Sequence, residues 1–138
     1  QVIILKNFMN KILVEVSVGE LFDKISILEI KKDKIKDKDN LRFIEDEYKV
    51  LSDQLNQKIK SNSKLDELFV ALKNVNSKLW DIEDEKRMCE KNQDFGDIFV
   101  KLSRDVHFLN DDRAKIKLEI NNLTGSKIKE IKNYTKYK

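Results

Sequence analysis

The stretch FVKLSRDVHFLNDDRAKIKLEINNL, residues 99–123, decides the fold because its apolar side chains follow a helical period. Apolar residues recur three or four positions apart, as one buried face of an α-helix requires. They are Phe99, Leu102, Val106, Leu109, Ile116, Ile120 and Leu123. One longer gap interrupts the series, and Arg113 occupies it. A guanidinium on a buried stripe is costly unless a carboxylate pairs with it. The stretch therefore predicts a long helix that carries either a buried ion pair or the floor of a polar pocket.

The preceding half of the chain predicts two shorter helices. Residues 17–20 (SVGE) have the spacing of a capping box, which starts a first helix that runs to about Lys36. Apolar residues cover more than one side of this helix, so we expect it to meet more than one neighbour. Asp39 or Asn40 can cap a second helix, which ends at the polar break 61–63.

The third and fourth helices are predicted to be the longest. Ser63 can cap a third helix that ends near Asn92. Its apolar residues follow a heptad repeat; they are Leu65, Leu68, Leu72, Val75, Leu79 and Ile82. Residues 94–96 form the next turn, with Asp94 as the candidate N-cap of the fourth helix, and Gly125 stops that helix.

Composition and connection lengths agree on the fold class. A chain of 138 residues forms one domain, and the absence of proline with only three glycines leaves few turns. Short connections favour antiparallel neighbours. We therefore predict an all-α, antiparallel four-helix bundle, dominated by a long hairpin of the last two helices and preceded by a short extended N-terminal arm. A long two-stranded coiled coil is the competing fold, and the wide apolar surface of the first helix argues against it.

The chain divides into three predicted parts. Residues 1–16 form an N-terminal extension or arm, in which residues 12–16 have the β-branched, alternating character of a short strand or extended segment. Residues 17–123 form the helical bundle domain. Residues 124–138 form a basic C-terminal tail, as either a short helix or a mobile segment.

Charge is unevenly distributed along the chain. The net charge is +3, but residues 124–138 hold five lysines and one glutamate, so the tail carries +4 and the rest of the chain −1. This balance argues against a basic nucleic-acid-binding body, and a solvated tail is favoured over one that contacts phosphate or anionic lipid. The apolar runs at the start are too short to span a membrane and lack the cleavage site of a signal peptide.

One cysteine and one histidine limit the available chemistry. Cys89 alone allows no intramolecular disulfide and no cysteine-based metal cluster, which fits the reducing cytoplasm. With His107 as the only histidine, a histidine metal site or a Cys/His dyad is poorly supported. The carboxylates within residues 81–85 indicate a solvent-facing run rather than a magnesium site. We therefore expect no metal and no cofactor, and we lean against an enzyme.

Polar residues beside the two long apolar seams mark a candidate site. If the last two helices are antiparallel about the 94–96 turn, residues whose numbers sum to about 190 lie opposite each other. Glu83 then lies one helical turn from Arg113, Asn76 is nearly level with it, and Trp80 can cover the guanidinium.

Further polar residues extend this candidate site. Arg87 continues the Trp80 stripe, and Asn110 and Lys117 share the Arg113 stripe. Candidate acidic partners on the first helix are Glu20, Asp23 and Glu29. Of these, Glu29 lies on the apolar side of that helix and can enter the same polar layer. The ligand-binding candidates are therefore Arg113, Lys117, Arg87, Glu83, Asn110, Trp80, Asn76 and Glu29.

This constellation has two interpretations. In the structural one, a Glu83–Arg113 pair fixes the register of the hairpin and does nothing else. In the functional one, Arg113, Lys117 and Arg87 hold a phosphate or carboxylate while Trp80 stacks on a ring. We favour the structural interpretation and keep the functional one as the alternative.

Several short motifs occur together along the chain. They are VGEL at 18–21, DKISILEIK at 23–31, LWDIED at 79–84, RMCE at 87–90, DFG at 94–96 and NDDRA at 110–114. Together they resemble a small bacterial helical family of unknown function, over about Lys11 to Gly125, with the lysine-rich tail outside. The resemblance implies a link to surface-polysaccharide and glycosyltransferase neighbourhoods, and it implies no mechanism.

Three roles follow from these observations. The first is a non-enzymatic helical binding or assembly module, expected to be a homodimer because leftover apolar surface such as the arm can be buried between copies. The second is a binder or modifier of a phosphorylated sugar or nucleotide through the Arg/Glu layer. The third is a phage or cell-surface structural component. We expect no specific nucleic-acid partner and no membrane span.

Overall fold

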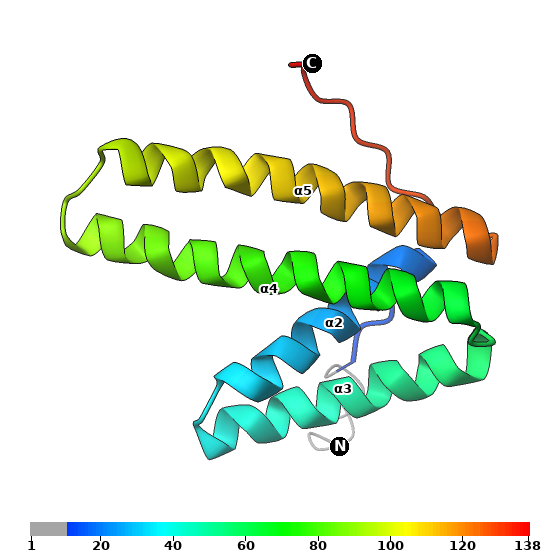
Figure 1. Ribbon diagram of the computed structural model, residues 1–138. Helices are drawn as coiled ribbons and strands as arrows, with labels where there is room; N and C mark the ends of the chain where they lie inside the picture. The colour runs from blue at the N-terminus through cyan, green and yellow to red at the C-terminus, as the bar shows by residue number, and fades with distance from the viewer. Residues whose placement is uncertain (1–10) are drawn as a thin grey trace.

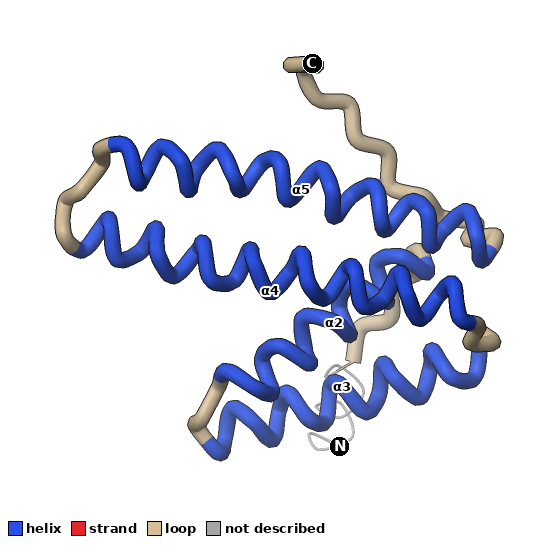
Figure 2. Tube along the Cα trace, in the orientation of Figure 1, coloured by secondary structure: helices blue, strands red, loops and turns tan. Residues whose placement is uncertain are grey.

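The computed structural model describes residues 11–138 and contains four helices over that range (Figure 1). They are α2 (Val18–Lys34), α3 (Lys38–Lys58), α4 (Ser63–Lys91) and α5 (Asp97–Thr124). No strand occurs among these residues, and the chain on either side of the helices is loop (Figure 2). The protein is therefore an all-α four-helix bundle, as predicted.

Two of the predicted helix ends are confirmed. Ser17 is the N-cap of α2, and its side chain accepts a hydrogen bond of 3.0 Å from the backbone N–H of Glu20. Gly125 ends α5 in the left-handed conformation with φ 66°, which glycine adopts without steric cost.

The other three predicted caps are wrong by one to three residues. Asp37, and not Asp39 or Asn40, caps α3, because its carboxylate accepts from the N–H three residues ahead at 2.9 Å. Asn62 caps α4 in the same way, so Ser63 is the first helical residue. Gly96 is the N-cap of α5.

Asp94 has a different role from the predicted one. Its side chain accepts a hydrogen bond of 3.1 Å from the N–H of Gly96, two residues on, and so closes the turn before α5 begins. The cap of α5 itself makes no side-chain hydrogen bond.

Helix α2 holds the fold together. Helices α4 and α5 form a long antiparallel hairpin, and α2 packs against both of them and against α3 (Figure 1). Among the described helices, the backbone of α3 lies close only to that of α2. The end of the hairpin around residues 92–96 extends past α2 and α3 in Figure 1. The predicted long hairpin of the last two helices is confirmed, and of the two shorter helices it is α2 whose backbone packs against it.

The apolar core lies where α2 meets the hairpin. Its buried members come from three helices and are Phe22, Leu65, Leu68, Leu72 and Ile120. Leu72 and Ile120 are fully buried. The core therefore anchors the first turns of α2 between the beginning of α4 and the end of α5, which places the polar side chains of α2 against both long helices.

The two ends of the chain differ from expectation in detail. Residues 12–16 are exposed and form neither a helix nor a strand. The part of the predicted arm before Lys11 lies outside the described residues. The tail after Gly125 contains no helix (Figure 2).

Candidate functional site

Arg113 pairs with a carboxylate of α2. Its Nε donates to Asp23 Oδ1 at 2.9 Å, and its Nη2 donates to Asp23 Oδ2. Two parallel N–H···O bonds of this kind fix both the position and the plane of a guanidinium. The side chain of Asp23 is 1% exposed and that of Arg113 is 30% exposed, so the acid is buried and the base closes it off from solvent.

Asp23 is also bound from α4. Asn76 Nδ2 donates to Asp23 Oδ1 and to Ser26 Oγ, both at 2.9 Å. Ser26 in turn donates to the backbone carbonyl of Asp23 at 2.8 Å. Asn76 and Ser26 are both buried. The result is a polar layer, Asp23–Ser26–Asn76–Arg113, that joins α2, α4 and α5 by hydrogen bonds.

The environment of Asp23 favours its charged form. Burial raises the pKa of the Asp23 carboxyl. Hydrogen bonds from Arg113 and Asn76, together with the charges of Arg113 and Lys117, lower this pKa by more than burial raises it, so it lies below the ordinary value of 3.8. The hydrogen bond to Asp23 likewise raises the pKa of Arg113. The pair is therefore ionised at neutral pH.

Lys117 extends the layer along α5. Its Nζ lies 2.6 Å from Glu20 Oε2, 3.7 Å from Asp23 Oδ2 and 3.5 Å from Glu130 Oε2. Lys132 in the tail also pairs with Glu130. Lys24 also lies 3.9 Å from Glu20 Oε1, so four cations face three carboxylates in this part of the site. Each of these cations already has a carboxylate partner, so the cluster presents no unpaired cation to an anion from solution.

The first turn of α2 is satisfied by α5 and the tail. Asn121 Oδ1 accepts from the N–H of Gly19 at 2.7 Å, and Ser126 Oγ accepts from the N–H of Val18 at 3.2 Å. Together with the Ser17 cap, these bonds occupy N–H groups that would otherwise be open at a helix N-terminus. The start of α2 is therefore a contact with α5 and the tail, and it is not an anion site.

The sequence analysis did not predict this contact between α5 and the start of α2. Asn121 is 2% exposed and follows Arg113 and Lys117 at intervals of four, so the stripe that contains Arg113 continues with another buried polar residue. Asp23 and Ser26 likewise repeat at helical spacing after Gly19 on α2. A comparison of the polar stripe of α5 with that of α2 would have predicted that these residues meet.

Five of the predicted site residues do line one groove. Asn76, Trp80, Glu83, Arg87 and Arg113 surround it, with Ile27, Ile30 and Leu79 as its apolar part. Among residues 11–138 no carboxylate forms an ion pair with Arg87. The groove therefore brings an indole, a free guanidinium and an amide to the same place.

The predicted Glu83–Arg113 pair is wrong. Glu83 is exposed, and the Arg113 guanidinium is directed to α2 and bound by Asp23. Trp80 lines the groove beside Arg113, but no cation–π contact joins the two within the described part of the chain. The reason is that α2 offers a carboxylate closer to the core than α4 does.

The remaining predicted residues lie elsewhere. Lys117 and Asn110 line a second, polar groove with Glu130 and Tyr134 of the tail, and Arg113 separates it from the first. The expectation that Glu29 enters the polar layer is wrong. Glu29 instead accepts from Lys73 at 3.0 Å and from Tyr48 at 3.3 Å, on the side of α2 that faces α3 and α4.

The tail is exposed but lies along α5. The Tyr137 hydroxyl hydrogen-bonds to Asp111, and its ring packs edge-on against His107 at 5.3 Å and Phe108 at 5.6 Å. Because Glu130 also meets Lys117, the tail returns along the helix that it follows. Lys129 of the tail donates to Asn122 Oδ1 at 2.9 Å, and Lys138 lies over the ring of Phe108.

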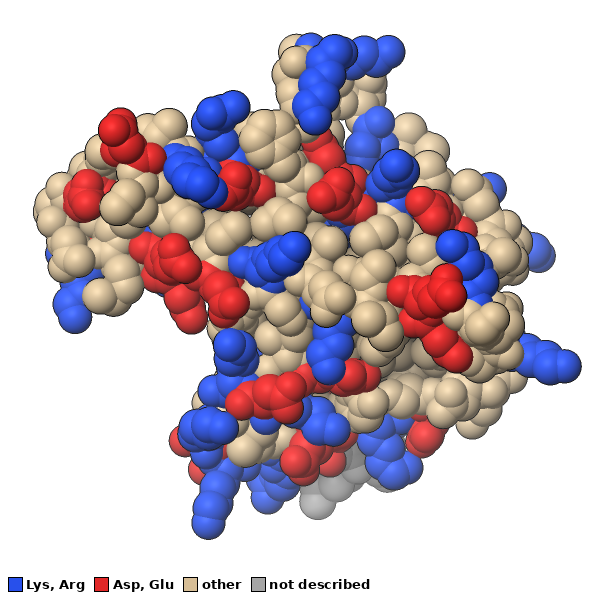
Figure 3. Space-filling model, viewed as in Figure 1, with Lys and Arg blue, Asp and Glu red and all other residues tan. Residues whose placement is uncertain are grey.

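The surface of the molecule carries mixed charge. On the face shown in Figure 3, acidic and basic side chains are interspersed over α4 and α5. Over residues 11–138 no helix is apolar enough over a sufficient length to cross a membrane. Within the same residues no three acidic, histidine or cysteine side chains come together as a metal site.

Comparison with known proteins identifies a family without a known activity. Residues 12–137 match the family model described as a family of unknown function, DUF6165. The match extends to residue 137, so the expectation that the tail lies outside the family is wrong. No curated protein and no solved structure matches the chain.

Proposed function

Because the chain belongs to the DUF6165 family, whose function is unknown, we propose from its geometry that it is a non-enzymatic helical binding or assembly module that acts as a homodimer. The observation that carries this proposal is the closed pairing of Arg113 with Asp23 under Asn76 and Lys117. A site built to hold a ligand anion would leave part of that guanidinium unsatisfied.

The polar layer serves to specify one arrangement of three helices. Asp23 accepts from α4 and α5 at once, so a shift of either helix by one turn would leave a buried carboxylate unpaired. Single buried polar residues fix register and partner choice in helical assemblies in this way. Arg113 is accordingly a positioning residue of the scaffold.

Exposed apolar side chains support an assembly role. Ile12 is 86% exposed, Leu13 88% and Val14 73%, although all three lie within the family match. At the hairpin end, Phe95 and Ile98 are also exposed. Apolar surface of this kind is often covered by a partner, and a second copy is the simplest one. We also propose a cytoplasmic location, which the single buried thiol of Cys89 suits, and the bacterial surface-polysaccharide setting that the resemblance implies.

The mass of the protein in solution tests this proposal. Light scattering coupled to size-exclusion chromatography should give twice the chain mass over a range of protein concentrations, because the module is expected to form a closed dimer. A monomer at every concentration would contradict the homodimer. Rings or filaments of many copies would instead support a structural component of a phage or cell surface.

A second function is favoured by the groove beside Trp80. There the indole, the unpaired Arg87 and the Asn76 amide lie near an apolar floor, which suits a ring that bears a phosphate. Glu83 and Asp84 line the same groove and weaken its attraction for anions. This alternative is a binder or modifier of a phosphorylated sugar or nucleotide.

Thermal shift measurements separate the two functions. Sugar nucleotides, nucleotides and phosphosugars should leave the melting temperature unchanged if the module binds only protein, since a ligand of the native state raises stability by mass action. If one of them raises it, Arg87→Met should abolish the shift. Arg42→Met is the matched control, because Arg42 is an exposed arginine of α3 outside the groove.

A further inference from the structure

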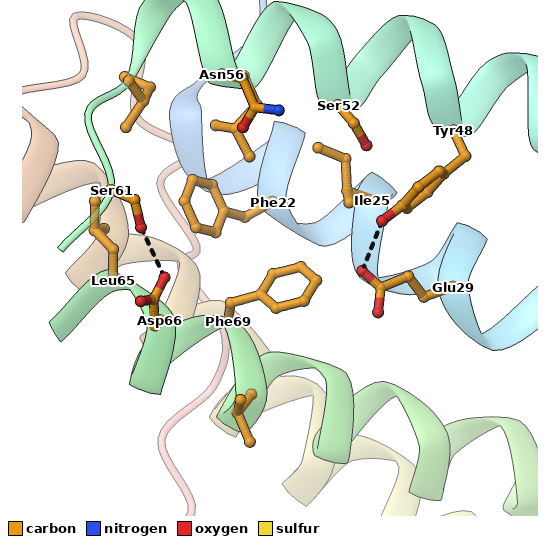
Figure 4. A pocket seen from close by; sticks show the side chains of 13 residues that line it. Phe22, Ile25, Glu29, Tyr48, Ser52, Asn56, Ser61, Leu65, Asp66 and Phe69 are labelled. Atoms are coloured by element: carbon orange, nitrogen blue, oxygen red, sulfur yellow. Dashed lines mark hydrogen bonds between the residues drawn. The ribbon is translucent and has the colours of Figure 1, made fainter. Parts of the chain in front are cut away.

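Another groove, separate from the Trp80 groove and the polar groove of Lys117, lies on the side of α2 that faces α3 and α4. It lies between α3 and α4, whose backbones do not approach each other, and α2 forms its floor (Figure 4). Its apolar lining comes from all three helices and includes Phe22, Ile25, Leu55, Ile59, Leu65 and Phe69. The groove has a volume of about 340 Å³, and Val70 at its edge is 57% exposed. We name it the α2–α3–α4 groove.

The α2–α3–α4 groove holds a polar atom that lacks a partner. Ser52 Oγ is buried and forms no hydrogen bond among the described residues, and in Figure 4 this hydroxyl points from α3 toward α2. This hydroxyl is covered by the chain itself, and the accessible polar groups of the groove are those of Asn56 and Ser61. A segment with apolar side chains and free backbone N–H or C=O groups would match this apolar lining with its polar edge.

The segment Ile12–Val16 has those properties. It lies outside the helices, Ile12 and Val14 are largely exposed, and within residues 11–138 its backbone forms no hydrogen bonds. Alternate side chains share a face in an extended chain, so an arm that docks as an extended segment presents Ile12, Val14 and Val16 on one face and Leu13 and Glu15 on the other. One face of the arm is therefore entirely aliphatic and β-branched.

The dimensions of the arm and the groove agree. Five extended residues span about 16 Å at about 3.3 Å per residue. The groove follows α3 from Tyr48 to Ile59, and eleven helical steps of about 1.5 Å also span about 16 Å.

We propose that residues Ile12–Val16 of one copy occupy the α2–α3–α4 groove of a second copy, and that the exchange is reciprocal. The arm and the groove belong to the same chain, and within residues 11–138 Ile12, Leu13 and Val14 of the arm and Val70 at the edge of the groove are exposed. Reciprocal exchange about a two-fold axis covers both arms and both grooves in one closed dimer, whereas one-way docking would leave an arm and a groove open at each end of an assembly. This inference rests on the homodimer proposed above and names its interface.

Site-directed cross-linking tests the exchange. One chain carries Val14→Cys and the other Val70→Cys, at the exposed edge of the groove, both with Cys89→Ala so that the native thiol does not react. Mild oxidation of the mixed chains should give a covalent dimer of one chain of each kind, because Val14 of one copy then lies in the groove that Val70 of the other copy borders. Circular dichroism of each variant checks that the helices are retained.

The possible outcomes distinguish failure of the proposed arm exchange from failure of the homodimer. A chain carrying both cysteines that closes on itself as a covalent monomer overturns the proposal, since the arm then fills its own groove. A dimer by light scattering that gives no cross-link also overturns it, while the homodimer stands. A protein that is monomeric throughout overturns the homodimer as well.

Serine substitutions in the arm give an independent measurement with the native cysteine. Val14→Ser and Ile12→Ser should each weaken dimerisation by about tenfold, because each removes a buried aliphatic side chain. Leu13→Ser is the matched control on the outer face and should change dimerisation little. Equal weakening by all three variants would contradict insertion of one face of the arm.

Discussion

At the scale of single residues, Arg113 lies near the core because it pairs with the buried carboxylate of Asp23. Asp23 accepts from Arg113 and Asn76 and lies 3.7 Å from Lys117 Nζ. The arrangement is asymmetric, because the acid is buried while the base remains partly exposed. Loss of the base is therefore expected to be worse than the loss of an exposed arginine.

Replacement of Arg113 tests this asymmetry. Arg113→Met should lower the free energy of unfolding by on the order of 3 kcal/mol, since Asp23 is then a buried carboxylate without its main partner. Urea unfolding followed by circular dichroism measures the change. Arg42→Met should fall within about 0.5 kcal/mol of the parent protein, because surface substitutions rarely do more. If the two variants unfold alike, the pair contributes nothing to stability.

Gly19 is required by a close approach of two helices. A Cβ built on Gly19 would lie 2.5 Å from the backbone oxygen of Lys117, which is too close for any side chain. Gly19→Ala should therefore destabilise the protein by about 1–3 kcal/mol, although alanine normally favours a helix over glycine. The measurement is again the free energy of unfolding in urea.

Gly96→Ala is the matched control for that variant. A Cβ on Gly96 would meet only Asp94 Oδ1 at 3.4 Å, and the φ of −80° suits any residue. Because glycine is preferred to alanine at an N-cap, this substitution should cost at most about 1 kcal/mol and less than Gly19→Ala. A comparable loss at both glycines would show that the contact between α2 and α5 is not the cause.

The sequence alone identified Arg113 but not its partner, for a physical reason. Helical periodicity and the short 92–96 connection relate α4 to α5, so Asn76, Trp80 and Glu83 could be placed near Arg113 in advance. The position of α2 depends on tertiary packing of Phe22 against Leu68 and Ile120, which periodicity does not encode. Asp23 was therefore one candidate among several acids of α2, and Glu29 was favoured wrongly.

At the scale of helices, the caps show how local chemistry sets the boundaries. Asn62 and Asp37 cap their helices by accepting from an N–H three residues ahead. The sequence offers neighbouring polar residues at both places, and only the backbone conformation decides which of them is the cap. The existence and order of the four helices followed from the sequence, whereas three of their first residues did not.

The cap of α4 gives a prediction with a neighbouring control. Asn62→Ala should lower the free energy of unfolding by about 1 kcal/mol, because the N–H of Leu65 loses its acceptor. Ser63→Ala should cost less, since Ser63 is the first residue inside the helix. Thermal unfolding of both variants checks the order. The reverse order would restore Ser63 as the cap.

At the scale of the whole molecule, the buried carboxylate links stability to acid. The pKa of Asp23 is lower in the folded protein than its ordinary value of 3.8. The folded state therefore binds this proton less readily than the unfolded state, and its contribution to stability is full above the ordinary pKa and declines as pH falls through the folded one.

A pH series of unfolding experiments measures this link. The difference in unfolding free energy between the parent and Asp23→Asn should be constant at neutral pH and should shrink progressively below about pH 5. The asparagine cannot titrate, so the comparison isolates the one group. A difference that stays constant into acid would mean that Asp23 does not titrate differently in the two states.

The dependence of α3 on a single neighbour has a consequence for motion. Among the helices of residues 11–138 its backbone approaches only α2, while α4 and α5 contact each other and both contact α2. Separation of α3 breaks one interface and leaves the hairpin and the Asp23 layer whole. Local opening takes the least supported unit first, so amide protons of α3 should exchange with deuterium before those in the middle of α4 and α5. We therefore expect α3 to separate first, while α2, α4 and α5 remain packed together.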